Sequence, residues 1–166
     1  MRTLWAMPSI AILLIGPVSA QELVGCDKFK WPVEREMTAL RAAHLRQVNS
    51  STKLSAVPFV GTVVLVPSNT ANLPKEPERT PKDDTFSGYL VIMGIASGTY
   101  SISVSDAAWL DVVEDDHFLK AKAHSGVQGC QGIRKVLQFE LRGDPLIVQI
   151  SGAPTPRLNV AILPAE

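Results

Sequence analysis

The residues best suited to chemistry form an acidic cluster with one imidazole. The cluster consists of Asp111, Glu114, Asp115, Asp116 and His117. Carboxylate oxygens suit a hard cation and an imidazole suits a softer one, so the cluster could hold a metal ion. Its spacing differs from that of an EF-hand loop, and consecutive Asp residues are also common in a tight turn between two strands. The sequence therefore offers two interpretations, a metal site and a charged hairpin turn.

Histidines are scarce in this chain. There are three, at His44, His117 and His124. On one continuous strand, His117 and His124 would point to opposite faces, because side chains alternate along a strand. A metal site with two histidines and one carboxylate therefore requires that the fold brings in His44, or that the chain bends between 117 and 124.

A second candidate site combines an aromatic ring with two cations. Trp109 lies in a predicted strand whose pattern does not fix which way the indole points, and an exposed indole would favour contact with a carbohydrate. Arg134 and Lys135 could bind an anion, although two basic residues at the start of a strand are commonly just solvated. The preceding glycine-rich stretch, 126–132, lacks the Gly-Lys-Ser/Thr ending of a phosphate loop, so no cofactor is predicted.

The two cysteines, Cys26 and Cys130, are most simply interpreted as one disulfide in an oxidising compartment. Closing such a ring of about 100 residues removes about 4–5 kcal/mol of unfolded-state entropy if the native bond is unstrained. The alternative is a lipobox ending at Cys26, in which that cysteine carries a lipid anchor. The charge of Glu22 argues against this alternative.

The N-terminus predicts export. Residues 1–20 have the form of a signal peptide, with Arg2 before an apolar run and Val18-Ser19-Ala20 before a cut at Gln21. The apolar run is shorter than the roughly 20 residues of a membrane-spanning helix, so we expect no transmembrane segment and a periplasmic or secreted protein. With 16 basic and 16 acidic residues, the chain has no global charge to attract nucleic acid.

The elements that must position these residues are one helix followed by strands. Residues 21–55 form an N-terminal segment with a helix predicted over 32–47, and helical spacing puts Val33, Met37, Leu40 and His44 on one face. Residues 56–166 form the second predicted unit, in which a period of two predicts eight strands. These are 59–66, 86–93, 99–105, 108–114, 117–123, 133–141, 146–151 and 158–163.

Short strands separated by turns, with no alternation of strand and helix, predict a mainly β protein: an antiparallel sandwich or jelly roll of about eight strands with one N-terminal α-helix. Residues 68–85 interrupt the strands with prolines and charges, and predict a solvated, mobile connection.

Four stretches support a resemblance: 26–32 (CDKFKWP), 98–100 (GTY), 108–112 (AWLDV) and 129–135 (GCQGIRK). With them, the mature chain resembles a family of small, largely uncharacterised exported proteins of alphaproteobacteria, some of which carry the label homogentisate 1,2-dioxygenase. That enzyme is far larger and holds iron with histidine and glutamate, a set with no match here. Residues 86–163 also resemble the β-sandwich of bacterial pre-peptidase C-terminal domains, and this likeness implies a fold without implying a function.

Three function classes follow. The sparse, unclustered polar residues favour an exported, non-enzymatic binding or accessory protein with a protein or carbohydrate partner in the envelope. The resemblance implies an alternative, a small metal-dependent dioxygenase holding iron partly through His117. The third class is a structural envelope protein.

Overall fold

The computed structural model describes residues 23–143 and 145–165. The predicted signal peptide, residues 1–20, lies outside this described part. Within it, no helix has the length and apolar character needed to cross a membrane.

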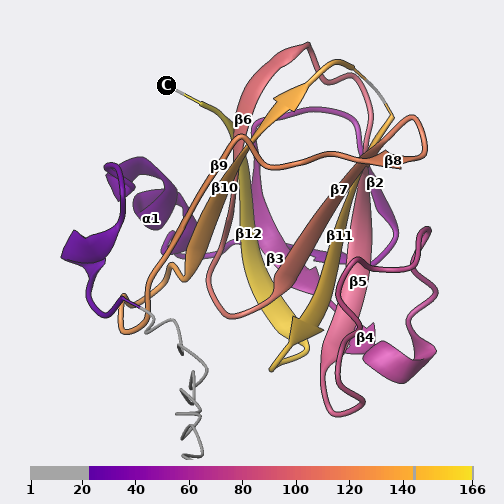
Figure 1. The fold of residues 1–166 in the computed structure, drawn as a ribbon, viewed down its shortest axis with the longest axis horizontal. Helices are drawn as coiled ribbons and strands as arrows, with labels where there is room; N and C mark the ends of the chain where they lie inside the picture. Colours follow the sequence, from indigo (N-terminus) through magenta and orange to yellow (C-terminus); the bar gives the residue numbers. More distant parts are fainter. Residues whose placement is uncertain (1–22, 144, 166) are drawn as a thin grey trace, which may run out of the picture.

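The described residues form two packed β-sheets (Figure 1). The first sheet has the order β1 (Arg46–Asn49), β3 (Phe59–Val64), β12 (Arg157–Pro164), β6 (Gly98–Val104), β10 (Lys135–Leu141) and β9 (Ala123–Gly126). The second has the order β2 (Thr52–Leu54), β5 (Phe86–Ile92), β11 (Leu146–Ala153), β7 (Trp109–Glu114) and β8 (His117–Phe118), with β4 (Val66–Pro67) paired to β5. The prediction of a mainly β sandwich-like fold with an N-terminal helix is confirmed, with twelve described strands instead of about eight.

The main core lies between the sheets and follows the alternation in the sequence. In β6, Tyr100, Ile102 and Val104 are buried in this core, and in β11 so are Val148 and Ile150. The Tyr100 hydroxyl donates to the Ala96 carbonyl at 3.1 Å, which satisfies the polar end of a buried ring. The period-two pattern predicted these inward rows because successive side chains point to opposite faces.

A second apolar cluster covers the outer face of the first sheet. The helix α1 (Glu34–Leu40) lies there, on the side away from β5 and β11 (Figure 1). The helix contributes Leu40, and Val33 immediately precedes the helix. Both side chains belong to one buried cluster with Ile133 and Val136. The predicted helix is therefore present and buries the predicted face up to Leu40, with Met37 partly buried.

The predicted helix boundary is wrong at its C-terminal end. The helix ends at Leu40 instead of residue 47, and His44 is exposed with a positive φ of 63°, so it does not belong to the buried face. Residues 46–49 instead form β1, which pairs in parallel with β3. This pairing supplies backbone hydrogen bonds to the edge of the sheet and buries Val48 in the main core, a position that a continued helix could not reach.

Two further differences come from crossings between the sheets. The predicted strand 117–123 divides into β8, paired with β7 in the second sheet, and β9, paired with β10 in the first. Residues 49–52 likewise cross from β1 to β2, with Ser51 at a φ of 68°. The sequence predicts a boundary near residue 56 between an N-terminal segment and the β-sandwich. In the structure, β1 and β2 lie before this boundary and yet are strands of the two sheets of the sandwich.

The disulfide between Cys26 and Cys130 is confirmed, and it joins residues separated by 104 positions. The glycine-rich stretch gives the backbone freedom expected around it, since Gly129 and Gly132 have φ values of 70° and 84°. The Gly25 amide also donates to the Gln128 carbonyl at 2.8 Å. Because the Cys26 sulfur is bonded to Cys130, it is not available for the lipid thioether of the lipobox alternative.

One buried hydroxyl suggests a stabilising substitution. Ser103 is fully buried in β6 opposite Val136 and Ala161, and its hydroxyl has no hydrogen-bond partner among the described residues. An unpaired buried polar group costs about 1–3 kcal/mol, so Ser103→Ala is expected to raise the free energy of unfolding by about 1 kcal/mol in urea denaturation. Ser87→Ala is the matched control and should destabilise, because its equally buried hydroxyl is 2.7 Å from the Ser68 hydroxyl. A loss of stability in Ser103→Ala would contradict this interpretation.

Candidate functional site

The structure separates the two buried carboxylates of the acidic cluster. Asp111 and Glu114 are three residues apart on β7, so they point to opposite faces of the second sheet. The Glu114 carboxylate accepts hydrogen bonds from the Arg142 and Gly143 amides, at 2.8 and 3.1 Å. This carboxylate therefore holds the loop between β10 and β11.

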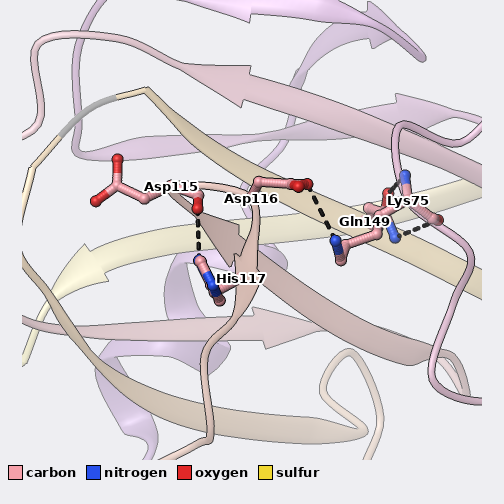
Figure 2. Close-up of polar contacts among 5 residues, drawn as sticks. All are labelled: Lys75, Asp115, Asp116, His117 and Gln149. Atoms are coloured by element: carbon pink, nitrogen blue, oxygen red, sulfur yellow. Dashed lines mark hydrogen bonds and ion pairs between the residues drawn. The ribbon is translucent and has the colours of Figure 1, made fainter.

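Asp115 and Asp116 form the hairpin turn between β7 and β8, and His117 begins β8. Asp115 and Asp116 have φ values of 50° and 63°, the left-handed conformation that a two-residue hairpin turn of this type requires. The His117 Nδ1 lies 2.6 Å from the Asp115 carbonyl oxygen, and Asp116 forms an ion pair with Lys75 at 3.0 Å (Figure 2). The hydrogen bond and charge of Lys75 lower the pKa of Asp116.

The predicted metal ligands are not brought together. Within residues 23–143 and 145–165, no group of three or more His, Cys, Asp or Glu side chains lies in an arrangement that could hold a metal ion. His117 begins β8 of the second sheet, whereas His124 belongs to β9 of the first.

The 68–85 segment is attached to the outer face of the second sheet. Gln149 of β11 is 1% exposed, and its side-chain amide pairs reciprocally with the Lys75 backbone at 2.8 and 3.1 Å (Figure 2). Asp111, directly opposite Gln149 in the pairing of β7 with β11, accepts from the Glu78 amide at 3.2 Å. The sequence predicts a solvated connection here, and the structure adds two buried side chains that bind its backbone.

Asp111 also fixes the indole of Trp109. The Trp109 Nε1 donates to the Asp111 Oδ1 at 2.6 Å, so one buried carboxylate holds both the indole and the 68–85 segment. Burial raises the pKa of Asp111, against the lowering effect of these two hydrogen bonds. The Arg79 guanidinium and the Lys135 ammonium lie 5.8 and 5.9 Å from the indole centroid, within cation–π range.

A cavity of about 840 Å³ opens beside Trp109. One wall is the 68–85 segment, and the others come from β7, from the crossing between β8 and β9, and from the start of β10. Leu110, Leu137 and Phe139 make part of its lining apolar. The cavity therefore sits at the edge of the sandwich where the two sheets part.

The lining is strongly basic. It contains the cationic side chains Arg79, Lys82, Lys120, Arg134 and Lys135. Glu78 is the one acidic residue in the lining, and His124 adds an imidazole. The Lys135 ammonium donates to the Ala108 carbonyl at 2.7 Å and Arg134 donates to the Val127 carbonyl at 2.8 Å, so both cations are held in place.

Trp109, Arg134 and Lys135, the three ligand-binding candidates from the sequence, all line this one cavity. Three further cations of the lining, Arg79, Lys82 and Lys120, were not predicted from the sequence. Arg79 and Lys82 lie in the 68–85 segment, whose charges the sequence predicts to be solvated, and Lys120 lies inside the predicted strand 117–123. Their local pattern carries no signal of a shared site, since the sheets and the 68–85 segment bring them together.

Comparisons of this chain with protein-family models, with curated proteins and with solved structures give no match. The candidate site consists of an indole held by a buried carboxylate in a cationic cavity at the edge of a β-sandwich.

Proposed function

We propose that this protein is an exported, non-enzymatic binding protein whose ligand occupies the cavity beside Trp109. The observation that carries the proposal is the cavity itself, which at about 840 Å³ falls within the roughly 300–1,000 Å³ typical of small-molecule sites. It combines the apolar side chains Leu110, Leu137 and Phe139 with five cationic side chains, two of which are held by hydrogen bonds to backbone carbonyls. Export is supported by the signal-peptide pattern of residues 1–20 and by the disulfide, a bond characteristic of oxidising compartments.

The fluorescence of Trp109 can report binding directly. The chain contains three tryptophans, so Trp5→Phe together with Trp31→Phe leaves Trp109 as the single indole of the full chain. We expect a saturable change in its emission with at least one member of a panel of neutral and acidic oligosaccharides, nucleotides, dicarboxylates, amino acids and inorganic phosphate. Trp109→Ala should weaken binding of that compound at least tenfold by calorimetry, whereas Trp31→Phe alone should leave it unchanged. No response to any panel member would contradict the proposal.

Metal analysis distinguishes this proposal from the dioxygenase alternative. The purified protein is assayed for iron, with His117→Ala as the diagnostic variant. Stoichiometric iron that is lost in this variant would favour the enzyme, whereas ligand binding at Trp109 that is insensitive to a chelator would favour the binding protein.

A further inference from the structure

The cavity concentrates positive charge that the chain as a whole does not have. The full sequence is balanced at 16 basic and 16 acidic residues, yet the cavity lining carries five Lys or Arg side chains and one Glu. Cations that share a recess with low-dielectric walls reinforce one another's potential and attract anions. The ligand of this site is therefore expected to be negatively charged.

The cations come from three separate segments. Arg79 and Lys82 belong to the 68–85 segment, Lys120 to the crossing between β8 and β9, and Arg134 and Lys135 to the beginning of β10. A ligand with one charged end would need a single cluster of donors. Cations contributed from three sides suit a ligand that carries several anionic groups along its length.

The same cavity offers an aromatic ring and hydroxyl groups. Trp109 is half-buried, with its Nε1 bound to Asp111, so the position of the indole is fixed. The Arg79 and Lys135 cations lie over this indole at 5.8 and 5.9 Å, so a sugar ring that contacts Trp109 meets both cations as well. Thr80, Ser125 and Ser151 also line the cavity and provide groups that can exchange hydrogen bonds with sugar hydroxyls.

From these observations we propose that the cavity binds an acidic oligosaccharide, with its sugar ring on Trp109 and its carboxylate or sulfate groups on the surrounding cations. This inference rests on the proposed function and narrows it to one ligand class. Carboxylates and sulfates present similar oxygen acceptors to Arg and Lys, so the experiment must distinguish them.

The test is calorimetric titration of the full chain with four probes at 50 mM salt. Trigalacturonate carries carboxylates, a heparin-derived tetrasaccharide carries sulfates as well, maltotriose is the neutral saccharide, and adenosine monophosphate joins a ring to one phosphate. We expect trigalacturonate or the heparin tetrasaccharide to bind at least tenfold more tightly than maltotriose and the nucleotide. The affinity for the acidic saccharide should be lower at 200 mM salt than at 50 mM salt, because salt screens interactions between exposed charges.

A pair of variants separates site-specific binding from general charge attraction. Arg79→Met with Lys82→Met removes two exposed cations of the cavity and should weaken the acidic saccharide at least fivefold. Lys53→Met is the control, because Lys53 is an exposed cation on β2, which does not line the cavity. It should leave the affinity unchanged.

The inference is overturned if maltotriose or the nucleotide binds as tightly as the acidic saccharides, although the proposed binding function would then stand. It is also overturned if none of the four probes binds, or if Lys53→Met weakens binding as much as the double variant. The proposed function itself fails only when the wider fluorescence panel is silent too, so the two failures can be told apart.

Discussion

Removing the Cys26–Cys130 disulfide is expected to lower the free energy of unfolding by about 4–5 kcal/mol, the entropy of a ring of roughly 100 residues in the unfolded chain. For a domain of this size such a loss corresponds to a fall in Tm of roughly 10–20 °C. The change is Cys26→Ala together with Cys130→Ala, which leaves no odd thiol. Urea denaturation of the variant and of the oxidised protein measures the difference.

The structure explains why the effect should concentrate at the N-terminal segment. Besides the disulfide and the apolar face of α1, this segment is tied to the sheet side by hydrogen bonds, among them the Asn159 side-chain amide to the Leu40 carbonyl at 3.1 Å and the Arg35 guanidinium to the Pro164 carbonyl. They also include the Lys30 amide to the Ser125 hydroxyl at 2.9 Å, and the Arg41 guanidinium to the Gln131 carbonyl. In the variant we expect trypsin to cleave after Lys28 and Lys30 well before the strands unfold. Reduction of the unmodified protein with dithiothreitol also removes the disulfide and serves as a second sample. An unchanged urea midpoint in both the variant and the reduced protein would contradict the prediction.

Asp111→Asn is expected to release the 68–85 segment, with about tenfold faster trypsin cleavage after Arg79 and Lys82. The carboxylate accepts from two N–H donors, the Trp109 indole and the Glu78 amide. An asparagine of the same size offers one acceptor oxygen, and its NH₂ group would face the other donor. One buried N–H is then unpaired, at a cost of about 1–3 kcal/mol.

This variant also has a predicted pH signature. Burial raises the pKa of Asp111 above its ordinary value of 3.8, so the folded state holds this proton more tightly than the unfolded state. The stability that this group contributes is present below its unfolded pKa and is lost as the pH rises through its folded pKa. Asp111→Asn removes that contribution. Its free energy of unfolding should therefore fall less, or rise more, than that of the unmodified protein as the pH increases from about 4.

The difference between the pH profiles of Asp111→Asn and of the unmodified protein reports on Asp111 alone, because the other carboxyls with shifted pKa values are present in both proteins. Asp116 and Glu140 have lowered pKa values, from their hydrogen bonds with Lys75 and with Thr99 and Lys122, and they favour stability in the opposite direction, at higher pH. Asp115→Asn is the matched control, since Asp115 is exposed in the adjacent turn. Equal trypsin cleavage in the two variants, or identical pH profiles for Asp111→Asn and the unmodified protein, would show that Asp111 does not hold the segment.

The fold class was predictable because it depends on local periodicity. Alternating rows such as 100–104 and 146–150 can bury one face only as strands, and their inward side chains form the core. The helix was predictable through Leu40, where its apolar spacing meets the second cluster. The end of the helix was not predictable, because Val48 is buried in the main core only as part of a strand that pairs with a distant strand. The local pattern of residues does not show that pairing.

The site was predictable in part. Trp109, Arg134 and Lys135 could be named from their residue types, and the disulfide from the count and context of the two cysteines. The acidic cluster was the strongest candidate for a metal site in the sequence. In the structure, the alternation of side chains along β7 places its two buried carboxylates on opposite faces of the sheet.

Only the tertiary structure decides which residues share the cavity. Arg79 and Lys135 approach the same indole although they are far apart in the chain, because Gln149 and Asp111 attach the 68–85 segment to the second sheet. A segment rich in proline and charge has no period of its own, so its position follows from hydrogen bonds with buried side chains elsewhere. The sequence by itself determined the sandwich and named three residues that line the cavity, whereas packing between distant elements determined where the positive charge gathers.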